Sequence, residues 1–332
     1  MYLCAPMSAV SVIIPVYKVE PYVARCARSL FEQTLEDIEY IFVDDCTPDR
    51  SIEIVKEVLA DYPKRKEQVQ FVRTPRNGGL ARARVFGLQH AKGDYIIHCD
   101  SDDAVERDAY CLMYNEATAN NYDVVTCRIT FRGLNRTKVF FQRSKEGREV
   151  GDILLGKALG YVWCRMFKRG LWDDIIPPQG DMWEDMVFSI QAMSKARRFG
   201  YVQDAGYIYY RRGDSISYTE GRHAAIKRWE SARDNTQIVI GFLENNPSVN
   251  RTEEDIVYFK YRTRDHLTPY IQSRDIYHKW RSTFPEIDSV LLKTRGIPLN
   301  IKIWFILIHL HLFYVCKTVT RFIRANYQKL LV

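Results

Sequence analysis

The first 131 residues alternate short apolar runs with amphipathic stretches. The apolar runs are rich in β-branched residues and bounded by turn residues, a pattern that predicts buried strands. The stretches between them carry apolar residues three and four positions apart, which predicts helices with one buried face. The predicted strands are 10–17, 38–43, 69–72, 95–97 and 123–131, and the predicted helices are 21–30, 52–59, a helix that follows Gly79, and 107–120.

Strand–helix alternation at this spacing predicts an α/β protein with a mostly parallel sheet and helices on both faces. Ligands of such sheets bind at the carboxyl ends of the strands. Three polar groups follow predicted strands: Asp44–Asp45, Gly78–Gly79 and Asp100–Asp103. We therefore expect these groups to meet in one crevice, although they are far apart in the sequence.

Beyond residue 131 the pattern is less regular. A helix is predicted to follow Glu184–Asp185, and Tyr207–Arg212 predicts an edge strand. Helical patterns dominate from about Arg222 onward. We therefore expect a sheet domain at 1–215, a helical region at 216–296, and a basic C-terminal segment at 297–332.

The composition is that of an ordinary folded protein, with 46% apolar and 27% charged residues in a chain of 332. The net charge of +7 is uneven, because residues 297–332 contain five basic residues and no acid. Charge gathered at one end, without a nucleic-acid motif, argues against nucleic acid and favours a membrane surface. The eight cysteines lack metal-binding or disulfide spacing, which favours buried free thiols. The N-terminal stretch does not have the pattern of a signal peptide.

The apolar run Ile303–Cys316 has 14 residues, whereas a membrane span needs about 20. From Val315 onward, apolar residues alternate with basic residues at helical spacing. This pattern predicts a basic amphipathic helix in the headgroup region of a membrane. The alternative is a terminal helix that packs on the body and leaves its basic face in solvent.

Asp100, Asp102 and Asp103 place three carboxylates within four residues, directly after a predicted strand. Like charges this close raise one another's pKa, so the cluster is unfavourable unless a cation lies among them. Carboxylate oxygens suit Mg²⁺ or Mn²⁺ when a diphosphate and water complete the coordination shell. The alternative to a metal site is a solvated acidic turn.

Glu184 and Asp185 stand at the start of a predicted helix. The alternative to a functional role for them is ordinary helix-start chemistry, because the helix dipole favours acids in the first turn.

Five segments, taken in order, resemble the family 2 glycosyltransferases, which have the GT-A fold, over about residues 10–215. The segments are Val12–Tyr17, Val43–Asp49, Asn77–Arg84, Asp100–Asp103 and Trp183–Asp185. The chain departs from the family pattern at two places. Cys46-Thr47-Pro48 stands where Gly-Ser-Thr is common, and Val85 stands where Asn is usual.

The resemblance implies that 1–215 is the nucleotide-sugar-binding catalytic domain and that 216–296 is an acceptor-side or packing region. It also implies roles for individual residues. Asp45 is expected to contact the nucleotide base, and Arg84 to approach the nucleotide. Asp102 and Asp103 are expected to hold the metal and the ribose, with Asp100 as the leading acid. The Glu-Asp motif is expected to supply the catalytic base, which falls on Asp185. Further motif residues expected in the active site are Pro15, Tyr17 and Gly79 on the nucleotide-sugar side, and Glu184 beside the base.

These residues also fit the chemistry of glycosyl transfer. A metal held at Asp103 would stabilise the charge that develops on a leaving diphosphate. Asp185 would take the proton from the acceptor hydroxyl. A single base without a nucleophile signature implies one displacement with inversion. The expected donor is a UDP-sugar, the expected cofactor is Mn²⁺ or Mg²⁺, and the expected acceptor is a glycan or lipid-linked saccharide.

Two other classes of protein remain open. A sugar-phosphate nucleotidyltransferase would need a glycine-rich basic loop after the first strand, and residues 16–20 contain no glycine. A non-catalytic, membrane-associated nucleotide-binding scaffold is disfavoured by the intact acids. The resemblance, joined to the basic tail, implies surface-polysaccharide assembly by a cytoplasmic protein peripheral on the inner membrane face. The sequence leaves the sugar, the linkage and the oligomeric state open.

Overall fold

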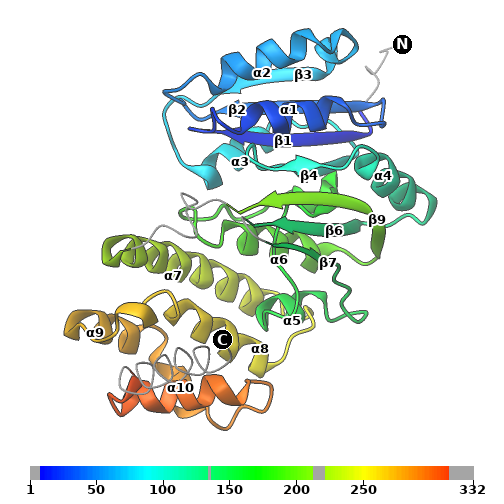
Figure 1. Cartoon of the computed structure of the whole chain (residues 1–332). Coiled ribbons are helices and arrows are strands. Elements are labelled where there is room, and N and C mark those ends of the chain that lie inside the picture. The colour runs from blue at the N-terminus through cyan, green and yellow to red at the C-terminus, as the bar shows by residue number, and fades with distance from the viewer. Residues whose placement is uncertain (1–7, 134–135, 212–220, 314–332) are drawn as a thin grey trace, which may run out of the picture.

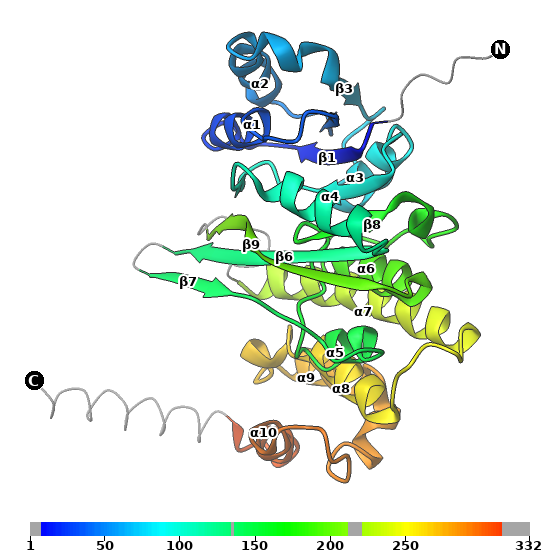
Figure 2. The ribbon, with the colours of Figure 1, turned by 90° about the vertical axis from the view of Figure 1, so that its right-hand side faces the viewer.

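The computed structural model describes residues 8–133, 136–211 and 221–313. It confirms the predicted α/β class: a sheet flanked by helices, followed by a helical region (Figure 1). Two views place β1–β3 at one end of the molecule and α8–α10 at the other (Figure 1, Figure 2).

The N-terminal half of the sheet is parallel and follows the predicted strands closely. Its order is β3-β2-β1-β4, and every neighbouring pair is parallel. All residues of β1 and β2 are buried, as expected of strands that are covered on both faces. The four strands are β1 (Val10–Val16), β2 (Ile38–Asp44), β3 (Val69–Arg73) and β4 (Tyr95–His98).

Alternate residues of these strands contribute to two separate cores. Val12 and Ile14 belong to the core that includes α1, α2 and α4, whereas Ile13 belongs to the core that includes α3 and α6. This is the consequence of the two-residue period of a strand. The helices that cover the two faces are α1 (Val23–Phe31), α2 (Ser51–Ala60), α3 (Leu80–Leu88), α4 (Ala109–Ala119) and α6 (Glu184–Lys195).

The other half of the sheet is mixed. β8 joins β4 in antiparallel orientation, β6 pairs antiparallel with β8, and β9 then runs parallel to β6. The strand predicted as an edge is instead flanked on both sides, because β5 pairs with the outer side of β9. The strands of this half are β5 (Ala104–Val105), β6 (Val124–Arg132), β7 (Thr137–Phe140), β8 (Arg165–Lys168) and β9 (Phe199–Tyr210).

The helical region packs on the sheet domain through α7, whose Val239, Ile240 and Leu243 belong to the core that includes α6. A third core surrounds Trp229 of α7 and Trp280 of α9. The remaining helices are α5 (Glu149–Leu154), α7 (Arg222–Asn245), α8 (Glu253–Arg264), α9 (Arg274–Ser282) and α10 (Leu299–His309), with short 3-10 turns at Pro63–Gln68, Arg169–Trp172, Thr268–Tyr270 and Pro285–Ser289.

Two sequence predictions fall outside the described residues. The domain boundary near residue 215 lies within 212–220, and the basic helix from Val315 lies within 314–332. In the ranges that are described, we find no helix with both the length and the apolarity needed to cross a membrane. The six cysteines in these ranges are free thiols, and four of them are buried.

Candidate active site

A cavity of about 800 Å³ opens at the carboxyl ends of the parallel strands. Its walls come from the loops after β1, β2 and β4, from the start of α3 and α6, from the loop 156–163, and from α8. The predicted crevice is therefore present. The sequence-predicted residues that line it are Pro15, Tyr17, Asp45, Gly79, Arg84, Asp100, Asp102, Glu184 and Asp185.

Asp45 fixes the glycine turn that leads into α3. Its buried carboxylate accepts hydrogen bonds from the backbone N–H of Gly78 (2.9 Å) and Gly79 (2.8 Å), and from the hydroxyl of Thr74 (2.8 Å). Gly79 has a φ of +85°, and a Cβ at this position would lie 2.6 Å from a carboxylate oxygen of Asp181. The turn therefore requires glycine.

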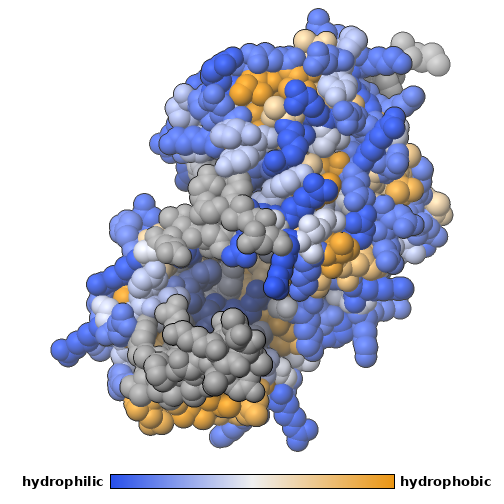
Figure 3. All heavy atoms as spheres, in the orientation of Figure 1, coloured by the Kyte–Doolittle hydropathy of each residue, from blue (hydrophilic) through white to orange (hydrophobic). Residues whose placement is uncertain are grey.

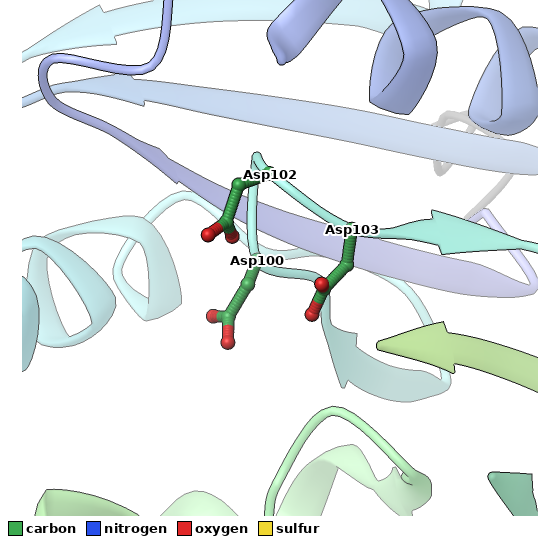
Figure 4. Close-up of side chains that lie close together, drawn as sticks. All are labelled: Asp100, Asp102 and Asp103. Carbon is green, nitrogen blue, oxygen red and sulfur yellow. The ribbon is translucent and has the colours of Figure 1, made fainter. Parts of the chain in front are cut away.

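The three acids after β4 project from one loop (Figure 4). Each offers a carboxylate oxygen, and these three oxygens lie within 4.8 Å of one another. Asp100 and Asp102 line the cavity. Asp103 is fully buried, and its two oxygens accept hydrogen bonds from the hydroxyl of Tyr207 and the backbone N–H of Tyr210, both at 2.8 Å.

Burial raises the pKa of Asp103 well above its usual range, and the charges of Asp102 and Asp100 raise it further. A bound cation would relieve this repulsion, because an opposite charge favours the ionised form. The donor set therefore fits a small divalent cation, with Asp100 and Asp102 on the cavity side and Asp103 anchored behind them.

Arg84 joins the two acidic motifs. Its buried guanidinium nitrogen Nη2 lies 2.9 Å from Asp100 Oδ1 and 3.7 Å from both Glu184 Oε1 and Asp185 Oδ1. These carboxylates raise the pKa of Arg84, although burial alone would lower it. Breaking a buried group of this kind is costly, because the remaining charge is left without compensation.

Glu184 and Asp185 lie in the first turn of α6 but do more than begin a helix, because both line the cavity and both face Arg84. Burial raises the pKa of Asp185 to about 6; Arg84 opposes this rise, and Asp100 adds to it. The pKa of Glu184 is raised well above its usual range, mainly by burial. Asp185 Oδ1 is buried and accepts no hydrogen bond from any described residue.

The side chains that hold the loop before α6 could not be identified from the sequence. Asn235 and Ser231 of α7 are among them. Asn235 accepts from the backbone N–H of Gln179 (2.7 Å) and donates to the carbonyl of Met182 (2.9 Å), and Ser231 accepts from the N–H of Met182 (2.9 Å). No local pattern marks these two residues, because they act from a helix about 50 positions further along the chain.

Asp181 and Trp183, which precede the Glu184–Asp185 pair, have structural roles that the sequence did not indicate. Asp181 accepts from the backbone N–H of Ala81 at the start of α3 (3.0 Å), so it ties the two walls of the cavity together. Trp183 has a left-handed φ of 67° and stacks on Phe259 at 5.3 Å. Such a conformation is uncommon for a bulky residue and is held by its surroundings.

The family model described as Glycosyl transferase family 2 matches residues 11–175. The uncharacterized glycosyltransferase EpsJ of Bacillus subtilis is 32% identical over 220 residues, which cover 63% of this chain and 62% of EpsJ. The poly(ribitol-phosphate) beta-glucosyltransferase of Bacillus spizizenii is 31% identical over 224 residues, which cover 65% of this chain and 33% of that protein. The chain thus spans less than two thirds of the length of these relatives.

Residues 1–349 of S. aureus TarS, solved in complex with UDP-GlcNAc, superpose with a TM-score of 0.55 and 19% identity, covering 86% of this chain and 91% of that one. This likeness shows the fold and confirms the predicted GT-A class. The chain belongs to glycosyl transferase family 2, as its motifs predict. The predicted enzyme class agrees with the names of these relatives, which are glycosyltransferases.

Proposed function

We propose that this protein transfers a sugar from a nucleotide-sugar donor to a hydroxyl group of a glycan or lipid-linked saccharide, in polysaccharide biosynthesis. One observation carries the proposal: Arg84 brings the acids after β4 and the acids of α6 together in a single cavity. The site thus has a place for a diphosphate with its cation and, within reach of it, a carboxylate to accept a proton. The relative from Bacillus spizizenii, named for glucosyl transfer to poly(ribitol-phosphate), supports the polysaccharide context.

On the donor side, Asp102 and Asp100 would hold Mn²⁺ or Mg²⁺, with Asp103 behind them. When bound, this cation neutralises charge on the leaving diphosphate. Asp45, Gly79 and the residues after β1, Pro15 and Tyr17, would receive the nucleotide. We propose UDP, which the fold neighbour TarS carries as UDP-GlcNAc.

On the acceptor side, Asp185 would act as the general base. Its pKa of about 6 leaves the carboxylate largely ionised at neutral pH, yet closer to the operating pH than an ordinary aspartate. Asp185 takes the proton of the acceptor hydroxyl, the hydroxyl oxygen bonds to the anomeric carbon, and the bond to the diphosphate oxygen breaks. Attack from the face opposite the leaving group inverts the anomeric centre.

Thermal stability with UDP, with Mn²⁺, and with both ligands together tests the donor site. Saturation at 100 times Kd adds about 2.7 kcal/mol to the free energy of unfolding. We expect a clear rise in melting temperature only when both ligands are present. If UDP, GDP and dTDP all leave the melting temperature unchanged with Mn²⁺, the non-catalytic scaffold becomes the better proposal.

We also propose that the protein binds peripherally to the inner face of the membrane through α10. Leu299, Ile303, Ile306 and Leu310 are 72%, 48%, 41% and 59% exposed and repeat every three or four residues, so they form one stripe. Figure 3 shows apolar residues along the lower edge of the molecule, where α10 lies. Basic residues follow this stripe in the sequence, which favours a surface with anionic lipid.

Co-sedimentation with phosphatidylglycerol vesicles tests this membrane proposal. The full chain is expected to pellet with the vesicles, and the double variant Ile303→Ser, Leu310→Ser to remain in the supernatant. The double variant Val139→Ser, Ile176→Ser removes exposed apolar side chains elsewhere and serves as the control. Equal recovery of all three proteins in the supernatant would mean that the stripe is covered by protein rather than lipid.

A further inference from the structure

The part of the cavity wall that comes from the C-terminal helices is basic. Arg262, near the end of α8, and His266, which follows it, both line the cavity. Both contact Trp183: the Arg262 guanidinium lies 5.2 Å from the centre of its ring, and the His266 ring meets it edge-on at 5.3 Å. Since Trp183 directly precedes the Glu184–Asp185 pair, these two side chains lie beside the proposed base.

The charge of Arg262 is only partly compensated by the described residues, because the carboxylate of Asp265 acts on it from beyond salt-bridge distance. Its Nη1 donates to the carbonyls of Ile153 (3.0 Å) and Leu154 (3.3 Å), and no described carboxylate lies within 4.0 Å of the guanidinium. Burial lowers the pKa of Arg262, and the charges of Tyr258 and Asp265 oppose this only in part. Arg84, at the other charged centre of the cavity, faces three carboxylates.

His266 adds a hydrogen-bonding group at the same place. Its Nε2 is buried and has no hydrogen-bond partner among the described residues. Burial, together with the positive charges of Arg228 and Arg262, lowers the pKa of His266 to about 4. The imidazole is therefore neutral at physiological pH and offers one N–H donor.

We propose that Arg262 and His266 form a subsite for an anionic group of the acceptor, a phosphate ester or a carboxylate. The planar guanidinium pairs with the oxygens of either group, and the imidazole N–H supplies a further donor. An anion bound here also compensates the charge of the half-buried Arg262. This inference rests on the proposed function, because the subsite is assigned to the acceptor through its position beside Asp185.

The competing explanation is that Arg262 only caps the end of α5. Arg251 provides the matched case: its guanidinium donates to the carbonyls of Leu243 and Asn246 at the end of α7 and of Val249 in the following loop. Arg251 does not line the cavity. Replacing each arginine by glutamine separates the loss of a helix cap from the loss of an anion site.

Isothermal titration calorimetry in the presence of UDP and Mn²⁺ provides the test. The charged probes are glycerol 3-phosphate and glucuronate, and the uncharged probes are glycerol and glucose. We expect one charged probe to bind the wild type more tightly than its uncharged counterpart. Its affinity is expected to fall about tenfold to a hundredfold in Arg262→Gln, from the loss of charged hydrogen bonds, and to stay unchanged in Arg251→Gln. The better probe identifies the anionic group.

Three outcomes would overturn the inference. Equal affinity of the wild type and Arg262→Gln for the charged probe would make Arg262 a cap only. A lower affinity of Arg262→Gln for UDP and Mn²⁺ would assign this arginine to the donor. Binding of neither charged probe would remove the subsite. If Arg262→Gln does not fold, His266→Gln preserves the contacts to α5, and an unchanged affinity in that variant counts against the proposal.

The proposed function fails separately from this inference. A wild type that does not bind UDP with Mn²⁺ would contradict the donor site, whereas the difference between Arg262→Gln and Arg251→Gln in binding the charged probe is measured independently.

Discussion

The two walls of the cavity are built in different ways. The wall at the strand ends consists of short loops directly after β1, β2 and β4, and its buried arginine, Arg84, faces three carboxylates. The wall from α6 and α8 is held by hydrogen bonds from Asn235 and Ser231 of α7, and its arginine, Arg262, has no carboxylate partner among the described residues. In the first wall the arginine is compensated and the clustered acids leave a negative charge for a cation, whereas in the second wall the arginine leaves a positive charge that an anionic ligand can compensate.

This difference indicates that the two walls bind different parts of the reaction. Under the proposed function the wall at the strand ends binds the donor and the wall from α6 and α8 binds the acceptor, and we call them the donor wall and the acceptor wall. The cation of the donor diphosphate needs acids that rigid strands hold in place. Acceptors differ among glycosyl transfers, and a wall made of separate helices can change without disturbing the strands. Measurements of donor binding and of sugar transfer in the same variants distinguish the roles of the two walls.

The largest effect is expected for Asp185→Asn. The amide cannot accept the proton, so transfer should fall about 10²- to 10⁴-fold, the usual contribution of a general base. UDP binding with Mn²⁺ should be unchanged, because Asp185 belongs to the acceptor wall. Steady-state kinetics and calorimetry measure the two quantities. Unchanged transfer in this variant would show that another group is the base.

Next in size is the contrast between Asp102→Asn and Asp103→Asn. Asp102 lines the cavity, whereas both oxygens of Asp103 accept hydrogen bonds from β9. We expect Asp102→Asn to weaken Mn²⁺-dependent UDP binding about 10- to 100-fold and Asp103→Asn to weaken it less. If the two variants lose the same affinity for UDP with Mn²⁺, Asp103 contributes to metal binding as much as Asp102 does.

A smaller effect is expected for Asn235→Ala. Removing this buried amide leaves the backbone N–H of Gln179 without its partner and takes one of two donors from the carbonyl of Met182, which costs about 1–3 kcal/mol of stability. It also loosens the loop before the base, so kcat should fall about tenfold while UDP affinity is retained. Asn245→Ala, at the exposed end of α7, is the matched control. Loss of UDP binding in Asn235→Ala would mean that α7 supports both walls.

The smallest effect concerns pH. Asp185 must be ionised to act as a base, and burial raises its pKa to about 6 from the ordinary value of 3.8. Transfer should therefore fall as the pH drops through 6, and kcat/KM at pH 5 should be about tenfold lower than at neutral pH. An ordinary aspartate would show no such fall above pH 5. A flat profile between pH 5 and 7 would contradict the raised pKa.

The residues of the donor wall could be predicted from the sequence because its loops directly follow strands with continuous apolar runs. The strand predicted at 38–43 is observed at Ile38–Asp44, and the acids after it and after β4 lie at the expected edge of the sheet. Local patterns suffice here, since a buried parallel strand needs continuous apolar residues and its ligand-binding loop follows at once.

The mixed half of the sheet could not be predicted in the same way. β7 and β8 have four residues each, and β8 enters the sheet between β4 and β6 in antiparallel orientation. Such short strands carry too few positions for a period to show. Their place depends on the strands that they join, which are distant in the sequence.

The sequence alone determined the family, the α/β class and the identity of the acids in both motifs, because these depend on residue types at fixed local spacing. Only the tertiary structure decided that Arg84 bridges the two motifs and that Asp103 bonds to Tyr207 and does not line the cavity. It also decided that α7 holds the loop before α6 and that α8 contributes to the cavity wall. The physical reason is distance along the chain. Hydrogen bonds and ion pairs join residues that are close in space but distant in the sequence. A local sequence pattern therefore does not indicate which buried polar group pairs with which partner.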